Sequence, residues 1–489
     1  MISFLISLAL LFAGYFIYGK FVGRVFGEDP ARPTPVKRLA DGVDYVELPT
    51  WKIFLIQFLN IAGLGPIFGA VMGVMFGPAA FLWIVFGTIF AGAVHDYLGG
   101  MLSIRRDGAS LPEIVGEQLG EKIKQLMRGF ALVLMILVGA VFVYNPADLL
   151  AMLTPGQLDR VFWISVIFAY YMAATLLPVD KLIGKLYPLF GIALLFMALG
   201  VLVMLFVHGS SVPEFWEGFY NHKPDPEASP IFPMMFVSIA CGAISGFHAT
   251  QSPMMARCLK NERHARPIFY GAMVTEGIVA LIWAAAAIAF TGGYSNLEET
   301  LSGSSPAVLV NNLTSSWLGA VGGVLAVLGV IAAPITSGDT ALRSARLIAA
   351  DFMGVNQRKI VRRLVISIPI FVACFIIMML PYEVLWRYFA WCNQELSVFT
   401  LWAVTVYLAS RGKRYVITLI PALFMTCVTT TYIFFAPEGF SALTMGLWDI
   451  AIPYELALGI GLLFSIALFV MFRMWLRGVE PQRVSLEKN

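Results

Sequence analysis

The sequence predicts an all-α polytopic membrane protein. Of its 489 residues, 59% are hydrophobic and only 13% are charged, and the mean hydropathy is +0.80. Soluble domains usually contain about 25% charged residues. Apolar stretches of about 20 residues, the length that crosses about 30 Å of hydrocarbon as a helix, recur along the whole chain. We therefore expect a bundle of transmembrane helices and no separate soluble domain.

About 13 membrane spans are predicted. The first is followed, not preceded, by Lys20 and Arg24, which favours an uncleaved span over a signal peptide. If the N-terminus lies outside, only Arg160, Lys223 and Arg387 among the 33 Lys and Arg residues fall on the outer side. Basic residues concentrate in cytoplasmic loops, so the N-terminus is predicted outside and the C-terminus inside. The predicted spans are centred near residues 10, 64, 92, 137, 169, 197, 244, 279, 333, 372, 397, 425 and 463.

Two connecting segments carry helix signals of their own. Ser110 and Glu113 have capping-box spacing ahead of an alternation of apolar and charged residues, which predicts an amphipathic cytoplasmic helix. The stretch from Gly292 to Ser316 has no Lys or Arg and contains Pro306, a residue suited to a first helical turn. It is either a short helix at the outer entrance or an ordinary connector.

Two of the predicted spans are interrupted in the middle. One has the sequence Q-F-L-N-I-A-G-L-G-P-I-F-G, residues 57–69, and the other S-I-A-C-G-A-I-S-G-F-H-A-T-Q-S-P, residues 238–253. Lipid does not tolerate unpaired peptide groups, so such breaks must be buried in protein or line a watery cavity. Interrupted spans at matching positions of two halves indicate the central site of a transporter. The alternative is that the glycines only allow close packing of helices.

The two breaks also divide the chain into repeats. Five spans counted from each break give two halves, and the first half starts inside whereas the second starts outside, so the repeats are predicted to be inverted. One span precedes them and two follow. The predicted segments are 1–50 (first span and cytoplasmic loop), 51–207 (first repeat), 208–230 (outer loop), 231–410 (second repeat) and 411–489 (two last spans and a short cytoplasmic tail).

Several motifs resemble the carbon-starvation protein (CstA) family. They are A-G-L-G-P at 62–66, A-G-A-V-H-D at 91–96, R-R-D-G-A-S at 105–110, A-C-G-A-I-S-G-F-H-A at 240–249, T-S-G-D-T-A-L-R-S-A-R at 336–346 and C-N-Q-E-L at 392–396. The resemblance implies a secondary transporter of peptides or pyruvate in the bacterial inner membrane. It also implies the amino acid-polyamine-organocation superfamily, whose five-plus-five inverted repeat is typified by the leucine transporter. This chain lacks the long insertion of larger members, which leaves the substrate open.

The backbone at the two breaks is the first candidate binding site. Half-helix N-termini carry partial positive charge and unpaired N–H groups, which suit a substrate carboxylate. Glycine lets such backbone approach a ligand because it has no Cβ. His248 lies one turn from Gln251 on the same helical face; the alternative is a buried histidine that only bonds a neighbouring carbonyl. The predicted substrate-binding residues are Gly63, Gly65, Gly242, Ser245, Gly246, His248, Gln251, Asn393 and Gln394.

A cation-coupling site is predicted on the ninth span. Thr336, Asp339 and Thr340 fall at i, i+3 and i+4, so their oxygens share one helical face. An ionisable group within a span costs roughly 2.5 to 3.5 kcal/mol, which makes Asp339 a functional candidate. The resemblance to the superfamily implies that carbonyls near Ala62 and Gly65 complete the site, for Na⁺ or H⁺. The alternative is a structural ion pair between Asp339 and Arg343.

Three further ionisable groups are candidates for a gate or a proton relay. His95 and Asp96 lie toward the cytoplasmic end of the third span, where helix capping or an ion pair with a nearby arginine is the alternative role. Glu276 lies in the eighth span, where a buried structural hydrogen bond is the alternative.

The leading function is a cation-coupled symporter that imports a small carboxylate-bearing nutrient, a peptide or pyruvate. The five cysteines include no C-x-x-C pair, and no H-E-x-x-H motif or hydrolase elbow occurs. We therefore expect no catalytic residue, metal site or cofactor, and partners limited to the small-molecule substrate and the lipid bilayer, without nucleic acid. A membrane-embedded nutrient sensor or a membrane enzyme is the alternative.

Overall fold

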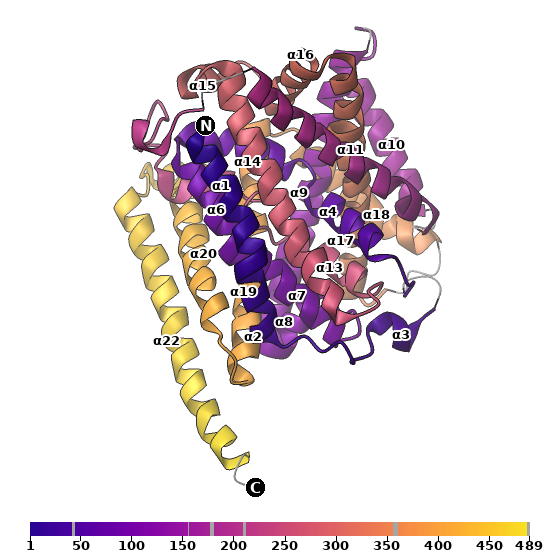
Figure 1. The fold of residues 1–489 in the computed structure, drawn as a ribbon, viewed down its shortest axis with the longest axis vertical. Coiled ribbons are helices and arrows are strands. Elements are labelled where there is room, and N and C mark those ends of the chain that lie inside the picture. Colours follow the sequence, from indigo (N-terminus) through magenta and orange to yellow (C-terminus); the bar gives the residue numbers. More distant parts are fainter. Residues whose placement is uncertain (42–44, 155, 177–179, 209–211, 356–359, 487–489) are drawn as a thin grey trace.

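The computed structural model describes residues 1–41, 45–154, 156–176, 180–208, 212–355 and 360–486. Within these ranges every regular element is helical. The helices stand side by side in one bundle, with the N-terminus and α15 (Tyr294–Ser302) at one end and α3 (Pro35–Leu39) at the other (Figure 1). We call these the α15 end and the α3 end. The all-helical class predicted from the sequence is confirmed for the described residues.

The structure is that of a multi-pass membrane protein. Nine helices of the described chain are long and apolar enough to cross a bilayer, and a bent pair of helices makes a tenth candidate. The nine are Ile2–Phe26, Ala79–Arg105, Glu121–Leu153, Pro188–Val207, Glu262–Thr291, Pro306–Leu325, Ile360–Ile377, Val416–Trp448 and Tyr454–Gly478, and the bent pair is Thr50–Ile61 with Gly65–Phe76.

Several of these candidate spans combine shorter helices. The first joins α1 (Ile2–Ala13) and α2 (Gly19–Phe26) through a π-helical turn, and a similar turn joins α6 (Ala79–Gly87) to α7 (Ala93–Arg105). The other candidate spans lie within a single helix or include one or two helices of this series: α9 (Glu121–Leu153), α11 (Asp180–Val207), α14 (Gly271–Thr291), α16 (Pro306–Ala326), α18 (Ile360–Ile377), α20 (Val416–Phe435), α21 (Phe440–Trp448) and α22 (Tyr454–Leu486).

Length and apolarity support nine or ten spans in the described residues, so the predicted total of about 13 is not confirmed. Near residue 169 the apolar helix α10 (Arg160–Leu176) is shorter than the others, and the predicted span near 244 is broken. The spans predicted near 333 and 397 are the helices α17 (Ala333–Phe352) and α19 (Tyr382–Ser410), which are not among the candidate spans. Both hold several polar residues, which lower their hydropathy.

The helix signals in the connecting segments are confirmed. Ser110 and Glu113 form a capping box at the start of α8 (Leu111–Leu119), which packs along α9 and α19. Pro306 lies in the first turn of α16. That helix is longer than the predicted outer helix, but Gly319 interrupts it with φ 59° and ψ −143°. The part of α16 before Gly319 is therefore a short helix at the α15 end, and the part after Gly319 continues toward α17.

Both predicted helix breaks are present. In the first, α4 (Thr50–Ile61) ends at Ala62 and a new helical segment starts at Gly65, with a bend of 54°. In the second, residues 239–247 are non-helical between α12 (Phe236–Ser238) and α13 (His248–Ala256). The two breaks touch: a Cβ added to Gly65 would lie 2.1 Å from Cys241 Cβ. Segments about 180 positions apart thus meet inside the bundle.

Candidate functional site

The glycines of the two breaks are enclosed by protein atoms. A Cβ on Gly63 would lie 3.0 Å from the Phe142 ring, one on Gly242 would lie 2.8 Å from Ala280 Cβ, and one on Gly246 would lie 2.4 Å from a backbone oxygen. Contacts this short leave no space for a side chain. In this conformation the predicted glycines let the two breaks pack against each other and against α9, α14 and α19. They do not border open space.

Asn393 of α19 holds the second break in place. Its Oδ1 accepts hydrogen bonds from Ser245 Oγ at 2.9 Å and from the backbone N–H of Phe247 at 2.7 Å, and its Nδ2 donates to Cys241 Sγ at 3.0 Å. Gln394 Nε2 donates to the carbonyl of Phe236 at 2.5 Å. The predicted ligands Asn393 and Gln394 therefore each satisfy a backbone group at the second break, as buried peptide groups require, and the Ser245 hydroxyl is bonded to the Asn393 side chain.

Four ionisable side chains form a continuous chain beside this break. Asp96 of α7 lies between two histidines: Oδ1 is 2.8 Å from His95 Nδ1, and Oδ2 is 2.8 Å from His248 Nδ1. The other ring nitrogen of His248, Nε2, lies 3.3 Å from Glu276 Oε2 of α14. We call His95, Asp96, His248 and Glu276 the acid–base chain. Sequence analysis treated these residues as separate candidates on three spans, and the fold brings them together.

The acid–base chain is closed off from solvent and from other ions. All four side chains have a relative exposure of 0%. Within the described part of the protein, no Lys or Arg forms an ion pair with Asp96 or Glu276. The thiol of Cys241, which is hydrogen-bonded to Ser245 and Asn393, lies beside the acid–base chain. The alternative roles of helix capping or arginine pairing for Asp96 are therefore not what this structure shows.

Several buried polar atoms around the chain have no hydrogen-bond partner among the described residues. They include His95 Nε2, both Glu276 carboxyl oxygens and Gln251 Oε1. On α4, which packs against α13 and α14, Gln57 Oε1 and Asn60 Nδ2 are also unpartnered. Gln57 Nε2 lies 3.4 Å from Ser252 Oγ. Unpartnered buried polar atoms cost about 1–3 kcal/mol each, so their concentration here marks a place for a polar ligand or water.

Gln57 and Asn60 are thus site residues that the sequence-based assignment omitted. The signal was present, because two amides three positions apart interrupt an otherwise apolar helix. Their position next to α13 depends on a contact between segments nearly 200 residues apart, which no local pattern reveals.

The predicted cation-coupling residues are divided between two places in the bundle: Ala62 and Gly65 lie at the first break, whereas Thr336, Asp339 and Thr340 lie on α17. Helix α17 packs against α9, α10 and α18, whereas α4, whose end carries Ala62, packs against α11, α13 and α14. Phe142 of α9 lies between the end of α4 and α17. Its ring contacts Gly63, and its Cβ would lie 3.2 Å from a Cβ added to Gly338 of α17.

On α17 itself, Asp339 is paired with an arginine. Asp339 Oδ2 lies 3.5 Å from an Arg343 guanidinium nitrogen, which also donates to the carbonyl of Ala174 at 2.8 Å. Thr340 Oγ1 donates to the carbonyl of Thr336 at 3.1 Å. Asp339 Oδ1 is buried without a hydrogen-bond partner. The geometry thus contains the Asp339–Arg343 pair that sequence analysis considered as an alternative.

A cavity of about 570 Å³ at the α15 end reaches the two broken helices. Met72, Met234 and Ser238 form its inner part, and its outer wall carries Lys223 and Arg387. Lys223 is paired with Glu298 at 2.7 Å. We call this cavity the vestibule. It gives the α15 end a polar entrance above the breaks.

At the α3 end, a buried ion pair joins distant parts of the chain. Glu262 has an exposure of 0% and lies 3.0 Å from the guanidinium of Arg105 at the end of α7. Its carboxylate also accepts the backbone N–H of Asp29 at 2.8 Å. Hydrogen-bonded pairs of this kind join the first span, α7 and the segment after α13, so the bundle is tied together at the end opposite the vestibule.

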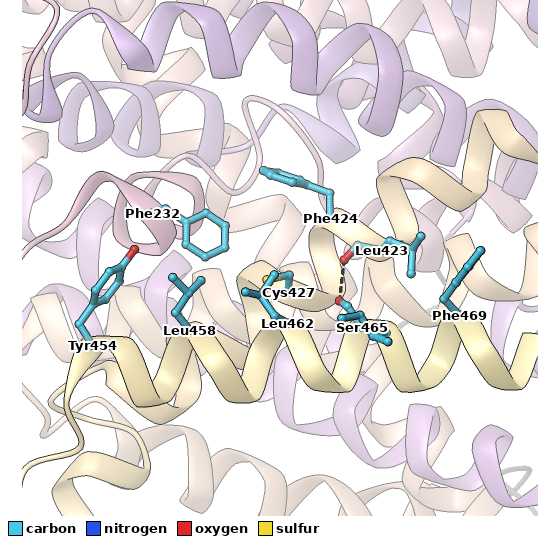
Figure 2. A pocket seen from close by; sticks show the side chains of 10 residues that line it. Phe232, Leu423, Phe424, Cys427, Tyr454, Leu458, Leu462, Ser465 and Phe469 are labelled. Atoms are coloured by element: carbon cyan, nitrogen blue, oxygen red, sulfur yellow. Dashed lines mark hydrogen bonds between the residues drawn. The ribbon is translucent and has the colours of Figure 1, made fainter.

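A second cavity, of about 560 Å³, lies on the flank of the bundle between α20 and α22. Figure 2 shows apolar and aromatic side chains along both helices, and the one hydrogen bond drawn there runs from Ser465 Oγ to the carbonyl of Leu423, 2.9 Å. Its lining includes no Asp, Glu, Lys, Arg or His. This surface is suited to lipid chains and offers nothing to bind a carboxylate.

The fold and the site define a multi-pass helical membrane protein in which two broken helices meet beside buried ionisable groups. Comparison with known proteins narrows this class. The family model of the carbon starvation protein CstA matches residues 1–155 and 150–314. The chain therefore belongs to the CstA family, as the motifs in the sequence indicate.

Two kinds of relatives support this assignment. An uncharacterized membrane protein of Haemophilus influenzae is 44% identical over 350 residues, which cover 62% of this chain and 94% of that protein. The peptide transporter CstA of Escherichia coli is 26% identical over 381 residues, 62% of this chain and 52% of the relative. The pyruvate/proton symporter BtsT of Escherichia coli is 26% identical over 351 residues, which cover 56% of this chain and 47% of that protein. The match thus spans about half the length of these two transporters.

Solved structures share the fold at low sequence identity. A crystal structure of the manganese transporter of Eremococcus coleocola superposes with a TM-score of 0.55 and 14% identity, covering 90% of this chain and 99% of that one. At this identity the likeness concerns the fold alone. Within the described residues, no group of three or more His, Cys, Asp or Glu is arranged to hold a metal ion.

Proposed function

We propose that the protein is a secondary active transporter that imports a small carboxylate-bearing nutrient, a peptide or pyruvate, together with a cation. The observation that carries this proposal is the contact between two broken helices at Gly65 and Cys241, next to the buried acid–base chain. Irregular backbone at membrane depth is tolerated only where it serves a buried site. The names of the CstA and BtsT relatives agree with transport of such substrates.

The proposal includes an inverted repeat with alternating access. The first break lies at the start of the half formed by 51–207, and the second at the start of 231–410, with one additional helix before and two after these halves. Two helix breaks that meet at the centre are what two inversely related repeats produce. Basic side chains such as Arg105 and Arg257 lie toward the α3 end, which supports a cytoplasmic α3 end and an external vestibule.

The substrate site proposed is the region between α4 and α13. Its polar atoms are those of the Gln57, Asn60, His248 and Gln251 side chains, beside the start of α13. Helix N-termini favour a carboxylate through their partial positive charge. Because the glycines are enclosed in this conformation, substrate access requires the two breaks to move apart.

The coupling cation, Na⁺ or H⁺, has two candidate positions. One is the Asp339 region of α17 with Thr336 and Thr340, and the other is the acid–base chain. One positive charge crossing a membrane potential of about 100 mV gains about 2.3 kcal/mol, enough for roughly 40- to 50-fold accumulation. A zwitterionic peptide carried with one cation gains this energy, whereas pyruvate carried with one proton is electroneutral.

Reconstitution tests the proposal. Purified protein in sealed proteoliposomes is given labelled pyruvate or labelled dialanine, under a Na⁺ gradient or a pH gradient imposed separately. We expect accumulation of one of these substrates above its external concentration, with an inward current for dialanine and none for pyruvate. Chemical conversion of either probe without accumulation would instead favour an enzyme, and binding without either would favour a sensor.

A further inference from the structure

We infer that the coupling ion is a proton and that it is held between His248 Nε2 and Glu276 Oε2. This inference deepens the proposed function and rests on it. It starts from the 3.3 Å separation of these two atoms, both in side chains of 0% exposure.

The hydrogen-bond pattern determines which nitrogens of the histidines carry hydrogen. Asp96 as a carboxylate accepts at both oxygens, so His95 Nδ1 and His248 Nδ1 are its donors at 2.8 Å each. With its hydrogen on Nδ1, a neutral His248 has only a lone pair on Nε2. That nitrogen lies 3.3 Å from Glu276 Oε2, and neither atom has a hydrogen-bond partner among the described residues.

One proton in this gap satisfies both sides. If it resides on Glu276, the acid donates to His248 Nε2; if it resides on His248, the imidazolium donates to the carboxylate. Without it, a lone pair faces a carboxylate, and two carboxylates, Asp96 and Glu276, share a closed site. No Lys or Arg among the described residues forms an ion pair with either. Buried charge without a partner is strongly unfavourable, so the site binds the proton.

Among the residues described, the acid–base chain also has an unpartnered polar atom at each end. Glu276 Oε1 and His95 Nε2 are buried polar atoms without hydrogen-bond partners in the described residues. They lie at opposite ends of the sequence Glu276, His248, Asp96, His95. His248 belongs to α13, the helix that follows the second break, so a movement of this break changes the distance from His248 to Glu276. Opening of the substrate site and release of the proton are thereby linked through one residue.

The pair is also a poor site for Na⁺. A sodium ion needs several oxygen ligands, whereas the side chain that faces Glu276 presents a ring nitrogen. By contrast, a proton needs one donor and one acceptor, which the two atoms supply. The proposal therefore assigns H⁺ to the acid–base chain and leaves no coupling role for Asp339.

The test uses Glu276→Gln in proteoliposomes with labelled pyruvate and labelled dialanine. Glutamine is neutral and can donate from its amide to His248 Nε2, so it imitates the protonated state but cannot release a proton. A gradient of one pH unit drives about tenfold accumulation of pyruvate carried with one proton. We expect Glu276→Gln to lose this tenfold accumulation and to keep exchange of internal for external substrate.

Thr275→Val is the matched control. Thr275 precedes Glu276 on α14, and its hydroxyl only donates to the carbonyl of Gly271 at 2.9 Å. This variant should accumulate substrate as the wild type does. Glu276→Asp, which retains an acid, should restore part of the pH-driven accumulation, and a pH-sensitive dye inside the vesicles should report acidification with wild type but not with Glu276→Gln.

Three results would overturn the proposal: pH-driven accumulation by Glu276→Gln, wild-type accumulation driven by Na⁺ alone, or a folded Glu276→Gln protein that has lost exchange as well. The first two leave the transporter function intact, whereas a wild type that accumulates neither probe argues against the proposed function itself. If Glu276→Gln does not fold, as judged by size-exclusion chromatography, His248→Gln replaces it with the same expected loss of coupling.

Discussion

Two carboxyl groups inside the bundle, Glu276 on α14 and Asp339 on α17, differ in what surrounds them. Asp339 has the Arg343 guanidinium at 3.5 Å, so its charge is balanced within one helical turn. Among the described residues, Glu276 has no ion-pair partner other than a protonatable histidine at 3.3 Å. Both are acids within apolar helices, and sequence patterns rank Asp339 higher. The difference teaches that a buried acid becomes a candidate for proton binding when its neighbours leave its charge unbalanced.

The largest effect is expected from Asp96→Asn. This change removes the carboxylate that accepts from both histidines, and each charge-assisted hydrogen bond is worth about 1.5–3 kcal/mol. An asparagine accepts at only one atom, so one histidine loses its partner. We predict that the variant loses the roughly tenfold accumulation that a gradient of one pH unit drives in proteoliposomes.

Asp159→Asn is the matched control for that experiment. Asp159 accepts the backbone N–H of Phe162 at the exposed start of α10, and asparagine accepts there equally well. Normal pH-driven accumulation by Asp96→Asn would show that the acid–base chain is structural, and the contrast between the two carboxyl sites would disappear.

A smaller effect, on stability, is expected from Asn393→Ala. The change leaves the backbone N–H of Phe247 and the hydroxyl of Ser245 without the acceptor that they share. Buried unsatisfied groups cost about 1–3 kcal/mol each. We predict a lower melting temperature in detergent together with reduced transport, because His248 directly follows the segment that Asn393 holds.

Asn296→Ala serves as its comparison. Asn296 donates to the carbonyl of Thr291 in an exposed position on α15, where water can replace it. An unchanged melting temperature for Asn393→Ala would mean that the second break is held by packing alone, and that Asn393 and Ser245 are free to serve as substrate ligands.

The smallest effect is expected from Asp339→Asn. This variant removes the Asp339 carboxylate from Arg343, which keeps the carbonyl of Ala174 as an acceptor. We predict a few-fold slower uptake with the pH-driven accumulation ratio unchanged, measured in the same vesicles with Arg343→Gln for comparison. Loss of the accumulation ratio in Asp339→Asn would show that the coupling site lies on α17, and that Asp339 rather than Glu276 is the coupling acid.

The contact between the breaks illustrates the limit of local patterns. Glycines at 62–66 and 241–246, with Pro66 in the first of these ranges, predict where the helices stop. Glycine lacks a side chain and proline lacks a backbone N–H, and either weakens a helix wherever it occurs. The sequence of these two ranges does not show whether their glycines contact a ligand or another segment of the chain. Gly65 faces Cys241, and this depends on the packing of distant parts of the chain.

By itself, the sequence determined the membrane class, the helical content, the positions of both breaks and the family. These follow from hydropathy, local backbone preference and motifs, which act over a few residues. Only the tertiary structure decided that His95, Asp96, His248 and Glu276 form one chain and that Phe142 separates Ala62 from Asp339. The physical reason is that charge balance and hydrogen bonding depend on atoms within about 3–4 Å. In this bundle those atoms come from helices up to about 180 residues apart in the sequence.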